Sequence, residues 1–393
     1  MLSAIRRACK PLARLVLIVP TLILAACVPA DGPAAGAGQK VDSKAPIAVA
    51  LLVPGGSGQT SDAILAKSLE NAARLAMADL SGVKIDLRVY QTGGNPGQAQ
   101  AMAVKAMDEG AKIILGPVFA QEANAAGVAA AGRNISVLAF SNNTDIAGGN
   151  VFVLGPTFQN TARRLAGYAV RQGKNKVMIV HDRNTAGEQG KNAVQRGVAA
   201  AGGTVVAVAS YEFSQNGVTG AAPAIVKTAQ ETGATAMFLT ADTAGALPLL
   251  SQSLINGGLA PSSTKFLGLT RWDIPTATLS LPGVQGSWFA LPDPALYAQF
   301  QTRYKAAYGE APHPIAGLAY DGIAAIGALA RSGKTADLGP RGLTQNAGFV
   351  GVTGIFRLRA DGTNERGLAV AEIRNNQVVV IDPAPRSFAG AGF

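Results

Sequence analysis

Few side chains in this sequence have the types and spacing that catalytic or metal chemistry requires. Histidine occurs only at His181 and His313, and cysteine only at Cys9 and Cys27. The two histidines are far apart, and neither has the neighbours of a zinc site or of a nucleophile–histidine pair. The sequence therefore predicts no catalytic residues, no metal site and no cofactor, and it indicates that the protein is not an enzyme.

Two glycine-rich segments are similar to nucleotide-binding or catalytic loops, but each lacks residues that those motifs require. In residues 55–60, GGSGQT, Gln59 replaces the last glycine of a nucleophile elbow, and Ser61 stands where a dinucleotide fingerprint needs its third glycine. Residues 187–191, GEQGK, likewise lack two residues of a phosphate-binding loop. We expect the first segment to offer backbone groups to an anion, with Ser57 as a candidate ligand contact.

The N-terminus has the features of a bacterial lipoprotein signal. Basic residues precede an apolar run that ends in Leu-Ala-Ala-Cys27 and is too short to span a bilayer. We therefore predict that residues 1–26 are cleaved and that Cys27 carries lipid, which attaches the protein to a membrane through about 0.8 kcal/mol per buried methylene. An ordinary leader with an accidental cysteine is the alternative. Val28 occupies the position where aspartate often signals retention in the inner membrane, so the outer membrane is favoured.

After the leader, the composition predicts a flexible tether followed by a mildly basic folded region. Residues 27–45 are rich in Ala, Gly and Pro, so we expect a flexible tether. Removal of the leader lowers the net charge from +10 to +6, because it contains four basic and no acidic residues. The remaining basic residues are scattered along the chain, which predicts no nucleic-acid partner.

Apolar runs alternate with helical patterns from residue 46 onward. The first run, Ile47 to Val53, is apolar throughout, and helical periodicity follows from Asp62 to Leu80. The alternation restarts after Gly155-Pro156. Strands that are apolar on both faces indicate parallel sheets covered by helices on both sides. The sequence therefore predicts an α/β fold with two similar lobes.

Four segments, in their order along the chain, resemble the leucine/isoleucine/valine-binding proteins of the type I periplasmic binding fold. They are Ile113 to Pro117, Val137 to Thr144, Ala319 to Gly322 and Gly351 to Phe356. The resemblance implies two Rossmann-like lobes, joined by three hinge crossovers, that close on a small ligand. The expected ranges are residues 46–155 plus 288–348 for the first lobe, 156–287 plus 349–382 for the second lobe, and 383–393 for a tail.

Three later segments are similar to the penicillin-binding-protein activator lipoproteins. They are Leu267 to Pro275, Gly286 to Asp293 and Phe300 to Gly309. The similarity implies a membrane-anchored relative of the binding proteins that contacts a peptidoglycan synthase and does not serve a transporter.

In the amino-acid binders, a loop at a helix N-terminus holds the ligand carboxylate with hydroxyls and backbone N–H groups. The matching loop here has no Ser or Thr, so only its backbone groups remain. The next matching turn keeps polar side chains, although a plain turn would look the same. The first-lobe candidates are Ser57, Phe119, Ala120, Gln121, Ser141, Asn142 and Thr144.

In the second lobe, the resemblance places Ala186 where family members commonly have an aromatic residue, so that contact is expected to be missing. Asp242 follows a strand and has the chemistry to receive an ammonium group or to cap a helix. Trp272, between Arg271 and Asp273, is either an exposed contact for an envelope ligand or partner, or a packing residue near the hinge. The second-lobe candidates are Asp182, Thr185, Asp242, Arg271 and Trp272.

Two functions remain open at this point. The first is a lipid-anchored periplasmic solute-binding protein that passes an amino-acid-like or other small polar ligand to an ABC permease. The alternative is a lipoprotein of the penicillin-binding-protein activator type, which acts through contact with a peptidoglycan synthase.

Overall fold

A computed structural model describes residues 39–42, 44–333 and 335–388, and the predicted signal and Cys27 lie outside these residues. The first lobe is built on a five-stranded sheet with the strand order β3-β2-β4-β5-β6, in which every neighbouring pair is parallel. Its strands are β2 (Ile47–Val53), β3 (Ile85–Gln91), β4 (Ile113–Leu115), β5 (Val137–Ala139) and β6 (Val151–Val153).

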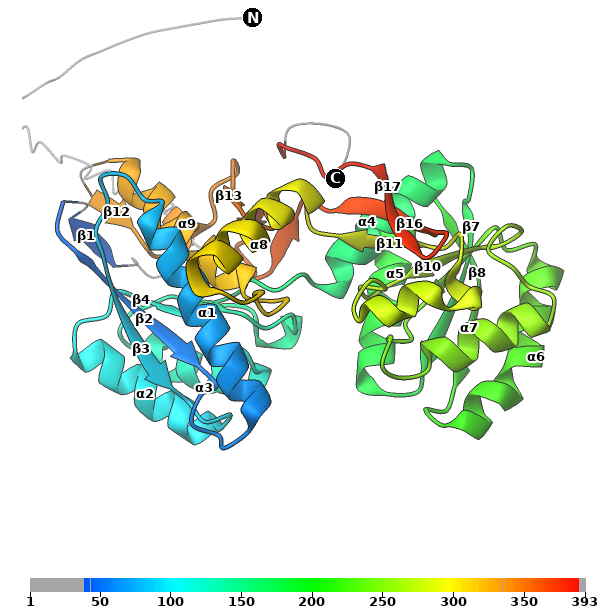
Figure 1. Cartoon of the computed structure of the whole chain (residues 1–393), viewed down its shortest axis with the longest axis horizontal. Coiled ribbons are helices and arrows are strands. Elements are labelled where there is room, and N and C mark those ends of the chain that lie inside the picture. The colour runs from blue at the N-terminus through cyan, green and yellow to red at the C-terminus, as the bar shows by residue number, and fades with distance from the viewer. Residues whose placement is uncertain (1–38, 43, 334, 389–393) are drawn as a thin grey trace, which may run out of the picture. The chain divides into compact units, whose positions relative to one another are not determined.

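Helices cover both faces of this sheet because its strands are apolar on both sides. Val49 and Leu51 of β2 belong to one buried cluster with the helices α1, α8 and α9, whereas Ala50 and Leu52 belong to another with α2 and α3. Side chains that alternate between two cores are the pattern of a parallel sheet buried on both faces. Figure 1 shows α1 and α2 on either side of the sheet. The helices are α1 (Thr60–Ala78), α2 (Pro96–Asp108), α3 (Ala120–Ala131), α8 (Pro294–Tyr308) and α9 (Gly317–Arg331).

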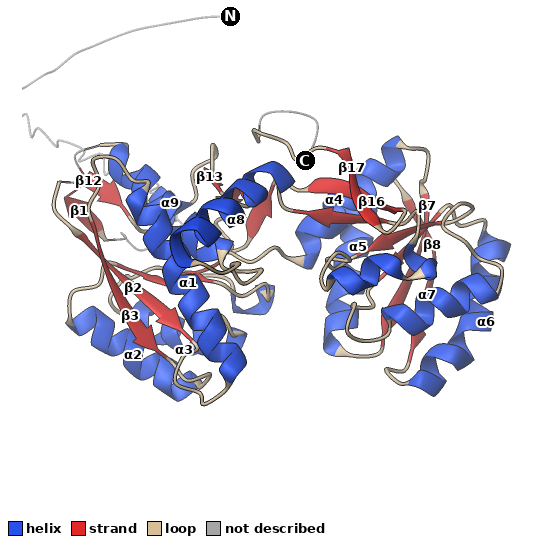
Figure 2. Ribbon diagram, viewed as in Figure 1, coloured by secondary structure: helices blue, strands red, loops and turns tan. Residues whose placement is uncertain are grey.

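The second lobe is built on a seven-stranded sheet with the order β17-β16-β11-β10-β9-β7-β8. The five strands β8, β7, β9, β10 and β11, in sheet order, are parallel. Strands β16 and β17 continue the sheet in antiparallel pairing. Figure 2 shows these strands with helices beside them. The strands are β7 (Lys176–Asp182), β8 (Thr204–Tyr211), β9 (Ala236–Leu239), β10 (Lys265–Gly268), β11 (Trp288–Leu291), β16 (Ala369–Arg374) and β17 (Gln377–Asp382).

This sheet is also covered on both faces. Met178 and Val180 of β7 pack with α6 and α7, whereas Val177 and Ile179 pack with α4 and α5. Three of the helices begin at a side chain that accepts a hydrogen bond from the first turn, namely Thr157, Asn184 and Ser214. The helices are α4 (Phe158–Arg171), α5 (Thr185–Ala200), α6 (Gln215–Thr232) and α7 (Leu247–Asn256).

Smaller elements complete the two lobes. A three-stranded antiparallel sheet places Phe349 and Phe356 in the core of the first lobe. Its strands are β13 (Phe349–Gly351), β14 (Gly354–Leu358) and β15 (Asn364–Arg366). The short helices are η1 (Thr144–Ile146), η2 (Thr276–Ser280), η3 (Pro282–Val284) and α10 (Pro340–Leu343).

Part of the expected tether is folded. Strand β1 (Lys40–Asp42), inside the range 27–45, pairs with β12 (Thr335–Asp337). Its middle residue, Val41, is 8% exposed and packs on the first core. The folded region therefore begins earlier than the Ala/Gly/Pro composition predicts, because the Val41 side chain is buried in the first core.

The chain crosses between the lobes three times, at residues 154–157, 292–293 and 367–368. The predicted α/β fold with two lobes and three crossovers is confirmed. The lobe ranges differ from those expected: β11 lies in the second sheet, whereas β13, β14 and β15 pack on the first core. The two later boundaries therefore move from residues 287/288 and 348/349 to the loops after Leu291 and Arg366.

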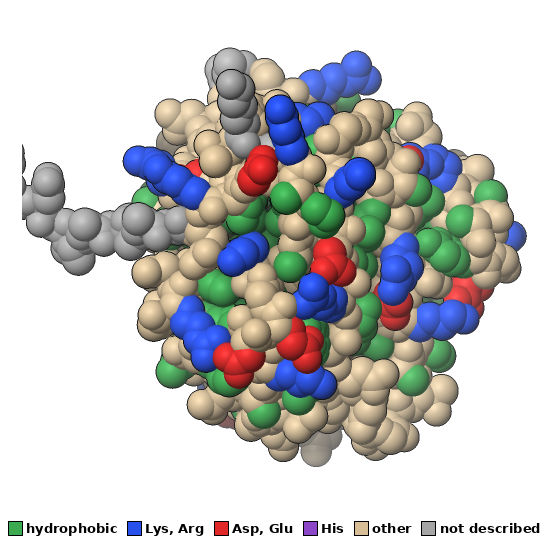
Figure 3. Space-filling model, turned by 90° about the vertical axis from the view of Figure 1, so that its left-hand side faces the viewer, with side chains coloured by type: hydrophobic (Ala, Val, Ile, Leu, Met, Phe, Trp, Pro, Cys, Tyr) green, Lys and Arg blue, Asp and Glu red, His purple; other side chains and the backbone are tan. Residues whose placement is uncertain are grey.

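The surface in Figure 3 carries both signs of charge. On this face, Lys and Arg side chains are interspersed with Asp and Glu side chains. Within the described residues, no helix combines the length and the apolar character needed to cross a membrane. The same part of the chain contains no group of His, Cys, Asp or Glu side chains arranged to hold a metal ion.

Candidate functional site

A cavity of about 220 Å³ lies where the three crossovers meet. The first crossover contributes Pro156 and Thr157, the second Pro292, and the third Leu368. Residues of both lobes complete the wall. Relative movement of the lobes would therefore change the shape of this cavity, as expected for a ligand site at a hinge.

The wall of the cavity is mostly apolar. Its apolar residues come from both lobes and from the crossovers: Phe158, Leu269, Ile274, Ala290, Leu291, Ile315, Leu318 and Leu368. A wall of this kind favours a ligand with an apolar body, since each Å² of apolar surface removed from water contributes about 25 cal/mol.

Hydroxyl groups provide most of the neutral polar positions in the wall, from Thr157, Thr161, Thr270 and Thr353. The Thr157 hydroxyl accepts a hydrogen bond from the Asn160 N–H and caps α4. The Thr270 hydroxyl is buried and has no hydrogen-bond partner among the described residues. A buried hydroxyl without a partner is costly, so a ligand group that bonds to it would remove this cost.

Two arginines also line the cavity, and each is paired with a carboxylate. The Arg271 guanidinium donates to both carboxylate oxygens of Asp273, one of them at 2.6 Å. Arg366 faces Asp321 at 3.3 Å. The two pairs leave the lining close to neutral.

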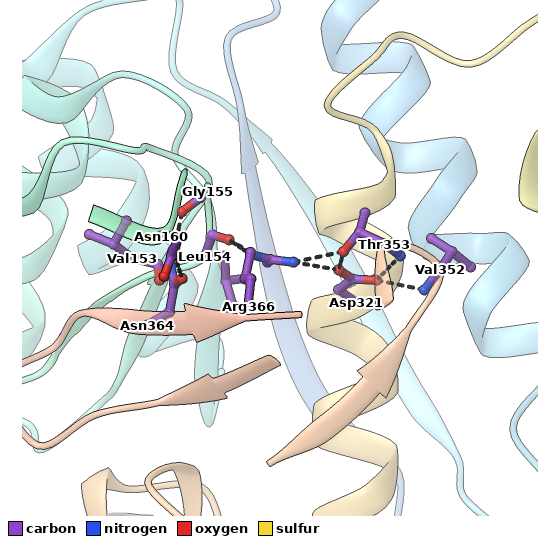
Figure 4. A network of polar contacts seen from close by, with 9 residues as sticks. All are labelled: Val153, Leu154, Gly155, Asn160, Asp321, Val352, Thr353, Asn364 and Arg366. Carbon is purple, nitrogen blue, oxygen red and sulfur yellow. Dashed lines mark hydrogen bonds and ion pairs between the residues drawn. The ribbon is translucent and has the colours of Figure 1, made fainter. Parts of the chain in front are cut away.

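The Arg366–Asp321 pair is the centre of a buried polar network (Figure 4). Arg366 Nε donates to the carbonyl of Leu154 at 2.9 Å, and its Nη1 donates to the Thr353 hydroxyl at 2.7 Å. Asp321 accepts from that hydroxyl and from the Val352 N–H. Burial raises the pKa of Asp321, and the charge of Arg366 opposes this rise. The network therefore holds an ion pair in the interior by satisfying it with several hydrogen bonds.

Asn364 extends this network to the first crossover. Its side-chain amide donates to the carbonyl of Val153 at 2.7 Å and to that of Gly155 at 2.9 Å. The amide groups of Asn364 and Asn160 are in contact at 2.7 Å. Strand β15 is therefore bonded to residues 153–155, although the two segments lie far apart in the sequence.

The predicted first-lobe residues lie on loops that follow the strands and at the first residues of α3 and η1. Phe119 is 41% exposed, and Ala120 begins α3. Ser57 donates to the Asp62 carboxylate at 2.8 Å, and the buried Ser141 accepts from the Asn143 N–H. The other three predicted residues of this lobe, all exposed, are Gln121, Asn142 and Thr144. Among the first-lobe candidates, Asn142 lines the cavity.

The second-lobe residues are more dispersed. Arg271 lines the cavity, whereas Thr185 and Asp242 are exposed at the starts of α5 and of the segment that leads to α7. Asp182 is 7% exposed, and its carboxylate accepts hydrogen bonds from the hydroxyls of Tyr211 and Thr240. That carboxylate is therefore already occupied by the chain's own donors.

Trp272 requires a correction. The interpretation of this residue as an exposed contact is wrong, because its side chain is fully buried in the second-lobe core with Phe266 and Phe289. The glycine at position 268 makes room for the indole: a Cβ there would lie 2.4 Å from the Trp272 ring. The alternative interpretation, a packing tryptophan, describes the structure.

Sequence reasoning missed the residues of the crossovers that line the cavity. Thr157 and Leu368 lie in none of the segments that carried the resemblances. Pro292 lies inside Gly286 to Asp293, and Thr353, in the turn between β13 and β14, lies inside Gly351 to Phe356, but neither was among the candidates. The break at Gly155-Pro156 was a further signal, since it marked the first crossover.

Glu122 is buried in the first turn of α3, directly after Phe119, Ala120 and Gln121. Its side chain is 1% exposed, neither carboxylate oxygen has a hydrogen-bond partner among the described residues, and burial raises its pKa. At pH values between the ordinary pKa of a glutamate and the raised pKa of folded Glu122, the folded protein binds a proton that the unfolded chain releases. The free energy of unfolding therefore falls as the pH rises through this range.

We expect Glu122→Gln to weaken this pH dependence. The variant should lose less stability than the wild type between pH 5 and pH 7, because its amide does not titrate. Urea unfolding at both pH values measures the difference, and Glu231→Gln, on the exposed face of α6, is the control. An equal loss of stability in Glu122→Gln and the wild type would contradict the interpretation.

No curated protein matches the chain. The model of the periplasmic binding protein family matches residues 46–377. Among solved structures, a putative branched-chain amino acid ABC transporter protein from Rhodospirillum rubrum has a TM-score of 0.72 and 18% identity, over 86% of this chain and 100% of its own.

Two further structures contain ligands. An ABC transporter substrate-binding protein from Desulfitobacterium hafniense in complex with Leu has a TM-score of 0.64 and 18% identity, over 86% of this chain and 100% of its own. A solute-binding protein of an ABC transporter from Rhodopseudomonas palustris BisB5, in complex with 3,4-dihydroxy benzoic acid, has a TM-score of 0.58 and 20% identity, over 86% of this chain and 96% of its own. With the family model matching most of its length, the chain belongs to the periplasmic binding protein family, and its two lobes have the type I fold.

Proposed function

We propose that this protein is the solute-binding component of an ABC transporter in the periplasm, and that it holds a small organic acid with an apolar body in the cavity at the crossovers. The observation that carries the proposal is the lining of that cavity, with apolar walls, threonine hydroxyls and the outer edge of Arg271. The ligands of the two solved structures, leucine and 3,4-dihydroxy benzoic acid, both combine a carboxylate with an apolar part. The protein acts by binding and not by catalysis.

Within this function, the loops of the two lobes provide further contacts. Ser57, Ser141, Thr144 and Asp242 remain proposed contacts when the lobes close, together with the backbone groups of residues 119–121. Asp182 fits an orienting role better, because its carboxylate holds Tyr211 and Thr240.

A binding panel tests the proposed function. Thermal shift and isothermal titration against leucine, benzoate and 3,4-dihydroxybenzoate should identify at least one ligand. At a concentration 100 times its Kd, that ligand should stabilise the protein by about 2.7 kcal/mol. The absence of a shift with every amino acid and aromatic acid tested would contradict the proposal.

Thr270→Val should separate ligand binding from stability. We expect the ligand affinity to fall by about 1 to 3 kcal/mol, because the hydroxyl bond to the ligand is lost. The stability of the unliganded variant should stay equal or rise, because a buried hydroxyl without a partner is removed. Titration and thermal unfolding measure the two quantities. Thr302→Val, on the exposed face of α8, serves as the control, and an unchanged affinity in Thr270→Val would count against this site.

The membrane anchor is a second part of the proposal. Lipidation of Cys27 would attach the protein to the cell envelope, with the outer membrane favoured over the inner. Mass spectrometry of the mature N-terminus tests this directly, and an unmodified Cys27 would contradict it.

The alternative, contact with a peptidoglycan synthase, drew support from an exposed Trp272. Because that side chain is buried, this support is lost, and the comparisons with known proteins add none, so we do not propose the alternative.

A further inference from the structure

A second hollow, of about 470 Å³, lies outside the ligand cavity and shares only Thr157 with it. Helices α4 and α5 form one side, and the hairpin of β14 and β15 forms the other. We call it the arginine groove, after the residues of its lining that carry the argument: Gln159, Arg163, Arg196, Arg359, Asp361 and Glu365.

One carboxylate in the groove is shared by three guanidinium groups. Glu365 accepts from Arg163 at 2.6 Å and from Arg359 at 2.8 Å, and Arg357 donates to its second oxygen. The Glu365 side chain is 10% exposed, and Arg163 and Arg357 help to lower its pKa, so the carboxylate is charged. One negative charge against three positive charges leaves this cluster with a surplus of two positive charges.

Arg196 adds a fourth guanidinium to the groove. Its Nε donates to the Gln159 side-chain oxygen at 2.8 Å, and no carboxylate of the described residues lies within ion-pair distance of it. Gln159 holds the guanidinium in place without neutralising it. A positioned arginine keeps several N–H donors in the planar arrangement that binds carboxylate and phosphate oxygens.

The acidic side chains nearby reduce this positive surplus but do not cancel it. Asp361, in the lining, already accepts from the N–H and the hydroxyl of Thr363. A neighbouring hollow of about 440 Å³ also contains Arg196, and its one carboxylate, Asp145, accepts from Gln189 at 2.7 Å. These neutral donors do not remove the charges of Asp361 and Asp145, so the four arginines exceed the three carboxylates of the whole region by one positive charge.

We propose that the arginine groove binds a multivalent oxyanion, either a phosphate group or an organic di- or tricarboxylate. Arg163 and Arg196 belong to the second lobe, whereas Arg359 belongs to the hairpin that packs on the first lobe. A bound oxyanion therefore bridges the two lobes at a place separate from the solute cavity.

Isothermal titration of the full chain with inorganic phosphate and with citrate, at low ionic strength, tests the groove. We expect at least one of them to bind, and Arg196→Gln and Arg359→Gln each to weaken that binding by about ten-fold or more, because each removes one charged, positioned donor set. Arg374→Gln, which removes an exposed arginine paired with Glu372 on β16, should leave the affinity unchanged. Binding of phosphate without citrate, or the reverse, identifies which oxyanion the groove accepts.

Three results would overturn the proposal. They are the absence of binding of both anions at millimolar concentration, binding that neither groove variant weakens, and equal weakening by Arg374→Gln. If Arg359→Gln does not fold, Arg196→Gln decides the question, since Arg196 is exposed and bonds only to the side chain of Gln159 among the described residues.

Discussion

Replacement of Arg366 by methionine should lower the free energy of unfolding by about 3 to 5 kcal/mol, because it leaves the buried Asp321 without its counter-charge. Arg366 and Asp321 are 2% and 0% exposed, so water cannot replace the lost partner. The substitution also removes the bond to Leu154, which ties β15 to the first crossover, and the bond to Thr353 in the turn between β13 and β14. Urea unfolding followed by circular dichroism measures the change.

Two further variants show whether the buried charge is responsible. Arg374→Met removes an arginine that is 55% exposed and paired with Glu372, and it should cost less than about 1 kcal/mol. The double variant Arg366→Met with Asp321→Leu should regain much of the stability lost by the single variant, because no unpaired charge remains. A double variant as unstable as the sum of the two single variants would show that the ion pair is not coupled.

Replacement of Gly116 by alanine should produce the second large loss of stability. Gly116 follows β4 with a φ of +84°, and a Cβ at this position would lie 2.2 Å from the carbonyl oxygen of Leu52 in the neighbouring strand. An alanine in this left-handed backbone conformation costs about 1 to 2 kcal/mol. The overlap of its Cβ with the Leu52 carbonyl costs about 1 to 3 kcal/mol or more. We expect a total loss of about 2 to 5 kcal/mol, which thermal and urea unfolding would detect.

Gly110 offers a matched control in the same lobe. Its φ is +96°, but nothing lies within 4 Å of the position that a Cβ would occupy. Gly110→Ala should therefore show only the backbone cost, about 1 to 2 kcal/mol. Equal losses at the two positions would show that contact with Leu52 is not important.

The elements that could be predicted are those whose own residues carry the pattern, either an apolar run or a helical periodicity. Ile47–Val53 has the bounds expected from its apolar run, and the helix expected at Asp62 to Leu80 is Thr60–Ala78. The sheet to which β11 belongs was not predictable, because its four residues, Trp288 to Leu291, do not show locally which strands they pair with. Their partners on one side, Ala369 to Glu372, lie far along the chain, so only the assembled sheet defines the strand.

The candidate site was predictable in part for the same reason. The resemblance located Asn142 and Arg271, which line the cavity. It did not cover Thr157 or Arg366, because their positions in the wall depend on where separate crossovers meet. Thr353 lies inside a segment that carried the resemblance, but nothing in that segment marked it as a cavity residue. The error at Trp272 has a physical cause, since flanking charges suggested exposure, whereas the indole occupies space left open by Gly268.

The three crossovers have a consequence for the order in which the protein is made. Neither lobe is one continuous piece of chain: β13 and β14 complete the first core, and β16 and β17 complete the second sheet. A growing chain that stops before residue 349 therefore lacks part of both lobes. Both cores therefore become complete only after the last segments of the chain have been made, so the two lobes reach their final packing together and not one after the other.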